Sequence, residues 1–255
     1  MKAGWIGFPR EGEDFWTSVE SYVKLGYRGM EGGEAILAEG NLQENLARLK
    51  SLGLEVLTVS TSVDEVEKDV DAVIAKAKSV NASRATIWWS PAMTGNADGF
   101  DKLVAEVSTM EKAATAMAKE NIKLCFHNHQ TEFFPQYGQP NTLDYMMQNS
   151  EKLCLELDVA WANFGGANPV EVLHMYKNRI AAVHIKDYLP NPESADTPLF
   201  TSLGTGVVDL LAVLQYLHSI NFEWVVYEQD TMRNLSTMES VTLSYLYMKE
   251  TGLVE

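Results

Sequence analysis

Four segments spread over half of the sequence end in residues that bind divalent metal ions. The candidate ligands are Glu132, Asp158, His184 and Glu228. Each closes or follows a run rich in Val, Ile, Leu, Phe or Cys, which is the composition of a buried parallel strand. Three carboxylates and one imidazole suit Mn²⁺, Mg²⁺, Co²⁺ or Zn²⁺ better than a metal that prefers thiolates. We therefore predict a site for one divalent metal ion, with Mn²⁺ as the first choice.

Two histidines and one lysine near these ligands have the chemistry of acids and bases. His127 and His129 are two residues apart, so they point to the same side if the strand continues. Imidazole exchanges protons near neutral pH, which makes His129 our first candidate for a general acid or base. His127 would orient the substrate, unless one of the two is a structural histidine under the loop. Lys186 would donate a proton or hold an oxyanion, or else form a salt bridge to a site carboxylate. Asp187 points the other way, which indicates a structural role.

A second group of residues has the properties of a sugar-binding wall. Sugars stack their C–H faces on aromatic rings, so we assign Trp161 and one of Trp88 and Trp89, with Trp88 as our choice, to substrate contact. Aromatic residues of a barrel are more often part of the core, and we interpret Phe8 in this way. Glu31 would bind substrate hydroxyl groups, with a salt bridge at the rim as an equal alternative.

The elements that must position these residues alternate regularly along the chain. Eight apolar, strand-like runs are separated by segments in which apolar positions recur three and four residues apart, as in amphipathic helices. The expected strands span residues 3–8, 27–31, 54–60, 84–89, 122–127, 153–158, 180–185 and 224–228. Eight strand and helix pairs close a parallel sheet into a (β/α)₈ barrel, which carries its active site at the C-terminal ends of the strands. The 255 residues fit one such domain, spanning residues 1–255.

Two expected loops are longer than barrel turns require. They span residues 130–140 and 188–208, on the face predicted to carry the site, where long loops serve as lids or substrate walls. Gly204 and Gly206 lie in the second loop, and Asp209 is a candidate helix N-cap after them. No lysine and serine pair completes a phosphate-binding loop there, and no G-x-G-x-x-G follows the first strand. We therefore expect neither a nicotinamide nor a flavin cofactor.

Composition limits the partners. The chain has 35 acidic and 20 basic residues, a formal net charge of −15, and such a surface repels nucleic acid. No stretch has the pattern of a signal peptide or is long enough to cross a bilayer, so we expect a cytoplasmic protein without a membrane partner. Cys125 and Cys154 lie in expected core strands, where small buried side chains are more common than a disulfide. A homo-oligomer is possible.

Several motifs, in this order and spacing, resemble a known family. They are FHNHQTEF, LELDVAW followed by GGANPVEVL, RIAAVHIKDY, SLGTGVVDL and YEQD. The sequence resembles the sugar phosphate isomerase and epimerase-like group of xylose-isomerase-type TIM barrels. The resemblance implies one divalent cation, held by Glu, Asp, His and Glu, that chelates neighbouring oxygen atoms of a sugar or keto-polyol.

The sequence departs from part of this group at two positions. His127 occupies the strand position of the metal-binding Glu of ketose epimerases, so Glu132 is the nearest carboxylate that could replace it. Trp161 stands where those epimerases tend to have a histidine. These departures favour the inosose dehydratase and 3-oxo-sugar branch. The related endonuclease IV needs more histidine ligands and a basic groove, which this acidic chain with five histidines lacks.

These residues predict an enzyme that removes a proton next to a carbonyl group of a sugar, keto-sugar or polyol. The outcome is isomerisation, epimerisation or elimination, since all three share an enediolate. One rival is a sugar-phosphate isomerase, for which Arg10 and Arg233 are the candidate phosphate ligands. A rival from another class is a sugar-binding barrel without catalysis.

Overall fold

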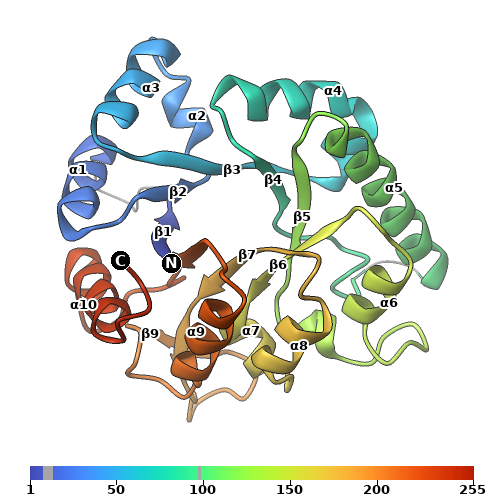
Figure 1. Cartoon of the computed structure of the whole chain (residues 1–255). Helices are drawn as coiled ribbons and strands as arrows, with labels where there is room; N and C mark the ends of the chain where they lie inside the picture. Colours follow the sequence, from blue (N-terminus) through green and yellow to red (C-terminus); the bar gives the residue numbers. More distant parts are fainter. Residues whose placement is uncertain (8–13, 97–98) are drawn as a thin grey trace. The chain divides into compact units, whose positions relative to one another are not determined.

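The computed structural model describes residues 1–7, 14–96 and 99–255. Eight parallel strands follow the order β1-β10-β7-β6-β5-β4-β3-β2 of a closed barrel, and Figure 1 traces them with their helices. The strands are β1 (Lys2–Ile6), β2 (Gly29–Glu31), β3 (Glu55–Thr61), β4 (Arg84–Ile87), β5 (Lys123–His127), β6 (Cys154–Asp158), β7 (Ile180–Ile185) and β10 (Trp224–Tyr227). The predicted (β/α)₈ barrel is therefore confirmed. The interpretations of Phe8 and Arg10 lie outside the described residues.

The helices follow the expected alternation, and most begin at a polar side-chain cap, whereas α2 and α5 follow a glycine and η1 has no side-chain cap. They are α1 (Phe15–Leu25), α2 (Glu34–Leu37), α3 (Leu42–Ser51), α4 (Val63–Ser79), α5 (Phe100–Ala118), η1 (Thr131–Phe133), α6 (Thr142–Gln148), α7 (Val159–Phe164), α8 (Pro169–Met175), α9 (Leu210–Ser219) and α10 (Thr237–Glu250). Asp209 accepts a hydrogen bond from the amide of Ala212 at 3.1 Å, which confirms it as the N-cap of α9. Within the described ranges, no helix combines the length and the hydropathy of a membrane span.

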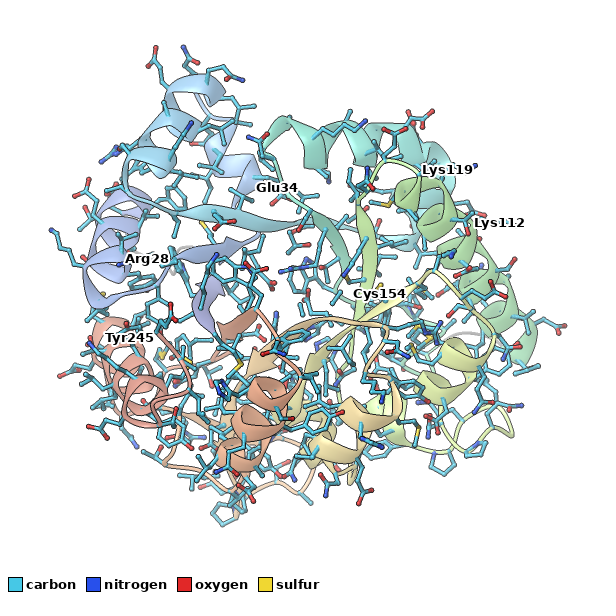
Figure 2. All side chains as sticks on the ribbon, in the orientation of Figure 1. Arg28, Glu34, Lys112, Lys119, Cys154 and Tyr245 are labelled. Carbon is cyan, nitrogen blue, oxygen red and sulfur yellow. The ribbon has the colours of Figure 1, made fainter. Side chains whose placement is uncertain are left out.

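The chain divides into two compact units, and the first contains Met1–Val56 and Val183–Glu255. In this unit β1 pairs in parallel with both β2 and β10. An aromatic cluster fills the core beside β1: the ring of Trp5 lies 5.8 Å from that of Tyr27, which lies 5.2 Å from Tyr245 of α10, labelled in Figure 2. Tyr27 precedes β2 instead of opening it, because its amide closes α1 by bonding to the carbonyl of Tyr22.

The second unit contains Leu57–Ala182. Its strands β3 to β6 pair in parallel along the chain, and the register aligns Cys125 with Cys154. Neither cysteine forms a disulfide with a described residue. On α5 the apolar side is buried, whereas Lys112 on the helix and Lys119 at its C-cap are exposed and extend outward in Figure 2.

A short antiparallel hairpin stands within the segment expected to be a loop over residues 188–208. Strands β8 (Asp187–Leu189) and β9 (Leu199–Thr201) pair with Tyr188 opposite Phe200. Both of these aromatic side chains are buried, which holds the two strands together although each has only three residues. The segment that follows β7 therefore contains regular secondary structure where the sequence predicted a loop.

Candidate functional site

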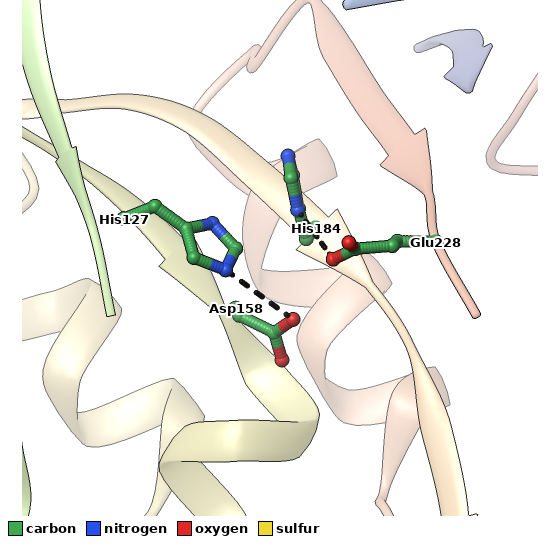
Figure 3. Close-up of side chains that lie close together, drawn as sticks. All are labelled: His127, Asp158, His184 and Glu228. Atoms are coloured by element: carbon green, nitrogen blue, oxygen red, sulfur yellow. Dashed lines mark hydrogen bonds and ion pairs between the residues drawn. The ribbon is translucent and has the colours of Figure 1, made fainter. Parts of the chain in front are cut away.

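In the second unit, a buried imidazole lies between two buried carboxylates at the C-terminal ends of β5 and β6. His127 Nε2 lies 3.9 Å from Asp158 Oδ2, a pair joined by a dashed line in Figure 3, and His127 Nδ1 lies 3.5 Å from Glu156 Oε1. All three side chains are almost completely inaccessible to water. The 3.9 Å separation is too long for a hydrogen bond between His127 and Asp158. Two atoms of kinds that can bind a metal ion therefore face each other without a hydrogen bond between them.

Glu156 is a site residue that the sequence interpretation missed. It precedes Asp158 by two residues on β6, so both carboxylates face the same side of the strand. Its Oε2 accepts a hydrogen bond from Thr86 Oγ1 at 2.9 Å, and Thr86 bonds to Thr58 at 2.8 Å. The alternation of Glu and Asp in the apolar run LCLELD was the available signal.

Asn128, between the two histidines of the HNH motif, joins the ends of β5 and β6 by two hydrogen bonds. Its side chain accepts from the amide of Asp158 at 3.0 Å and donates to the carbonyl of the same residue at 3.2 Å. Asp158 Oδ1 accepts from the amide of Trp161 at 2.8 Å and caps α7. One Asp158 oxygen thus holds the helix while the other faces His127.

The predicted aromatic residues line up with the two histidines. The ring of Trp88 lies 5.5 Å from His127, the two histidine rings are 5.1 Å apart, and His129 lies 5.6 Å from Trp161. Trp88 is half-buried beside His127, whereas Trp89 is 51% exposed. The second unit therefore presents four rings in sequence, with His129 between His127 and Trp161.

Glu132 lies under the turn that carries His129. Its side chain is fully buried, and Oε2 accepts from the amide of His129 at 3.0 Å and from Thr131 Oγ1 at 3.2 Å. Its other oxygen, Oε1, is buried and makes no hydrogen bond within the part of the chain that the structure describes. Burial raises the pKa of Glu132 to about 7. Its role as a metal ligand stays a prediction.

In the first unit, His184 of β7 is enclosed by two carboxylates. Its Nε2 lies 2.7 Å from Glu31 Oε2, and its Nδ1 lies 2.9 Å from Glu228 Oε2, the pair drawn in Figure 3. A neutral imidazole has a single N–H and can donate to only one of them. A cation bound through one nitrogen, with the proton on the other, satisfies both sides of the ring. A doubly protonated ring would also satisfy both carboxylates. The donor set of this unit is therefore compatible with a divalent metal as well as with an imidazolium.

Lys186 is fully buried beside the same carboxylate. Its Nζ donates to Glu228 Oε2 at 3.1 Å and to Asp230 Oδ1 at 2.7 Å, and it lies 4.5 Å from the ring centre of Phe200. The salt bridge considered for this lysine is present, while its catalytic role stays a prediction. Asp230 was not singled out from the sequence, although its spacing of two from Glu228 indicates a shared face.

Asp187 faces away from this group and organises the hairpin, which confirms its structural role. Its two oxygens accept four backbone N–H groups at 2.9–3.1 Å, and burial raises the pKa of its carboxyl although these hydrogen bonds lower it. The four donors are the amides of Tyr188, Gly204, Gly206 and Val208. The loop before α9 is thus fixed to the residue that follows Lys186.

A closed parallel barrel with polar side chains at the C-terminal strand ends is the architecture of (β/α)₈ barrel proteins. Residues 19–244 match the family described as xylose isomerase-like TIM barrel, so the chain belongs to this family. The resemblance noted in the sequence is confirmed.

Individual relatives are more distant. The chain is 27% identical over 139 residues to an inosose dehydratase of Geobacillus kaustophilus (strain HTA426), a match that covers 49% of this chain and 44% of that protein. The chain spans about half the length of the curated relatives it matches.

Solved structures share the fold over nearly the whole chain. A sugar phosphate isomerase/epimerase from Parabacteroides distasonis ATCC 8503 has a TM-score of 0.81 and 19% identity, covering 100% of this chain and 95% of the other. The IOLI protein, solved with a zinc atom, has a TM-score of 0.75 and 16% identity, covering 98% of both chains.

Proposed function

We propose that this protein is a metal-dependent enzyme that removes a proton next to a carbonyl group of a keto-sugar or keto-polyol. The observation that carries the proposal is the same in both units: a buried histidine with a carboxylate facing each ring nitrogen. Burying so many ionisable groups is costly unless a cation or a proton compensates them. The relative solved with zinc supports a metal in this family.

The proposed ligands are His127, Asp158, His184 and Glu228. They stand at or beyond the ends of β5, β6, β7 and β10, and parallel barrel strands gather their C-terminal ends at one face. We propose His127 in place of Glu132, because one oxygen of Glu132 is already held by its own turn. Two carboxylates and two imidazoles suit Mn²⁺, Co²⁺ or Zn²⁺.

Glu156 and Glu31 have a supporting role in this proposal. Ligating histidines usually donate their second ring N–H to a carboxylate, which fixes the tautomer and the orientation of the ring. Glu156 faces Nδ1 of His127 and Glu31 faces Nε2 of His184. The remaining nitrogen of each ring faces the proposed ligands Asp158 and Glu228.

The acid and base are His129 and Lys186. When bound, the divalent cation supplies Lewis acidity that stabilises negative charge on oxygen next to the carbon that loses its proton. His129 takes this proton, since it lies beside His127 without being one of the proposed ligands. Lys186, held by Glu228 and Asp230, is a buried cation that donates a hydrogen bond or a proton to the substrate. Trp88 and Trp161 contact the substrate ring.

The inosose dehydratase relatives support a cyclic keto-polyol as substrate and elimination of water as the outcome. Isomerisation and epimerisation begin with the same proton transfer. A direct test is to incubate the metal-loaded protein with an inosose in D₂O and to follow deuterium at the carbon beside the carbonyl group. Exchange or product formation that is lost on chelation and restored by metal supports the proposal. A protein that binds the inosose without either reaction is a sugar-binding barrel, and the proposal is then wrong.

A further inference from the structure

The first unit contains a pocket that neither the proposed metal site nor the proposed acid and base explains. Its volume is about 350 Å³, and its walls come from the β8–β9 hairpin, from residues after β10 and from the first turns of α10. These segments follow the C-terminal ends of β7 and β10. In (β/α)₈ enzymes the loops after the last two barrel strands frequently bind a phosphate group, so an anionic ligand has a precedent at this position.

The charge of this pocket differs from that of the whole protein. The chain has a net charge of −15, yet among the described residues that line the pocket the single charged side chain is Arg233, and none is acidic. Arg233 is exposed and makes no hydrogen bond or ion pair with any described residue. Its guanidinium is therefore available for an anionic ligand.

The rest of the lining is mixed, with five apolar residues and six uncharged polar ones. Phe200 is buried, but Leu189 and Leu243 are 42% and 45% exposed. The polar part consists of threonine and serine hydroxyls and the side-chain amides of Gln229 and Asn234. Exposed apolar side chains in the same lining as one guanidinium suit a ligand with an apolar body and a single anionic group.

The pocket adjoins the proposed catalytic residues through two shared side chains. The ring of Phe200 lines the pocket and also lies 4.5 Å from the ammonium group of Lys186. Gln229 lines the pocket and follows Glu228 directly, and its amide is held by the hydroxyl of Tyr227 and the carbonyl of Thr231, both at 3.0 Å. The pocket and the ammonium group of Lys186 therefore share the ring of Phe200 as a neighbour.

We infer that this pocket binds a carboxylate-bearing apolar group of the substrate, at a distance from the carbon that reacts. This inference rests on the proposed function for its link to the metal site. One guanidinium compensates one negative charge and forms a two-point contact with a carboxylate. A phosphate dianion would keep an uncompensated charge beside leucine side chains, which disfavours it.

The test measures binding of benzoate to the whole protein by isothermal titration calorimetry, with benzamide and inorganic phosphate as comparison probes. We expect benzoate to bind at least about tenfold more tightly than benzamide, because only benzoate pairs its charge with Arg233. Arg233→Gln should abolish this difference, whereas Arg48→Gln, in which the exposed Arg48 pairs with Glu20, should retain it.

A second pair of variants on α10 tests the apolar wall. Leu243 and Leu246 are 45% and 44% exposed, but only Leu243 lines the pocket. Leu243→Asp should weaken benzoate binding by about tenfold or more, since it adds a like charge beside the ligand, and Leu246→Asp should not. Equal effects of the two variants, or an unchanged affinity in Arg233→Gln, would overturn the inference. Tighter binding of phosphate than of benzoate would also overturn it.

The same titrations with metal-free and metal-loaded protein separate the two proposals. Benzoate affinity that is the same in both forms, and sensitive to Arg233→Gln, supports the pocket whatever the metal analysis shows. Benzoate binding that appears only with metal and does not depend on Arg233 places the ligand elsewhere and refutes the pocket. A protein without bound metal refutes the proposed function and leaves the benzoate result as a separate measurement.

Discussion

His184 Nε2 lies 2.7 Å from Glu31 Oε2, although 153 residues separate them in the sequence, and both side chains are fully buried. His127 has a corresponding carboxylate neighbour in Glu156. Each histidine thus meets one carboxylate that we propose as a metal ligand and one that we propose as its orienting partner. The following predictions separate these roles.

The metal ligands are tested by metal content. Purified protein should hold about one divalent ion per chain, and His127→Ala should lose it because one of four ligands is removed. Glu132→Gln should retain the ion, since the Glu132 carboxylate bonds to its own turn. Elemental analysis after dialysis measures both. If Glu132→Gln loses the metal and His127→Ala keeps it, then Glu132 and not His127 is the fourth metal ligand.

The orienting role of Glu156 is tested by metal affinity. Glu156→Gln should weaken binding by about 10–100-fold, because a neutral amide supports the ligating imidazole of His127 less than a carboxylate does. The measurement is a competition titration against a chelator of known affinity. Glu171→Gln, on the exposed side of α8, is the matched control and should bind as the wild type does. Equal metal affinities in the wild type, Glu156→Gln and Glu171→Gln would show that Glu156 does not support the metal site.

The base is tested by turnover. His129→Ala should slow solvent exchange at the substrate by about 10²–10⁴-fold and leave metal content unchanged, because His129 moves the proton without ligating. Exchange is followed by NMR in D₂O. If the variant exchanges at the full rate, the role of base passes to Lys186 or Glu228.

The raised pKa of Glu132 predicts a pH-dependent stability. The folded pKa of about 7 exceeds the usual 4.5, so the folded state binds a proton more readily than the unfolded chain between these values. The free energy of unfolding should therefore fall as the pH rises from about 4.5 to above 7. Urea denaturation across this range should show the fall in the wild type and in Glu151→Gln, an exposed control, but less of it in Glu132→Gln.

The contact between Gly206 and Asp187 predicts a steric cost. A Cβ atom at Gly206 would lie 2.1 Å from Asp187 Oδ1 and 2.4 Å from the carbonyl of Tyr188, so the loop must shift. Gly206→Ala should lower the free energy of unfolding by about 2 kcal/mol or more. Gly40→Ala, where a Cβ meets open space but φ is +73°, should cost about 1 kcal/mol. Equal costs would show that the loop adapts freely.

The sequence allowed prediction of features that repeat locally. Alternating strand and helix patterns indicated the barrel, and polar residues after apolar runs indicated the functional face. The β8–β9 hairpin was missed because its three-residue strands show no alternation and are separated by residues 190–198. Contacts between residues far apart in the sequence could not be predicted either. No local pattern indicates that Thr86 forms a hydrogen bond with Glu156 or that Glu31 contacts His184.

The four hydrogen bonds of Asp187 have an evolutionary consequence. They join β8 to the loop between β9 and α9 and involve no residue of the tip over residues 190–198, so the tip can change in length and sequence without displacing the neighbouring Lys186. Residues 190–198 can therefore vary while the backbone that is bonded to Asp187 keeps its position. Selection can therefore reshape what the protein accepts as substrate while the reacting groups stay where they are.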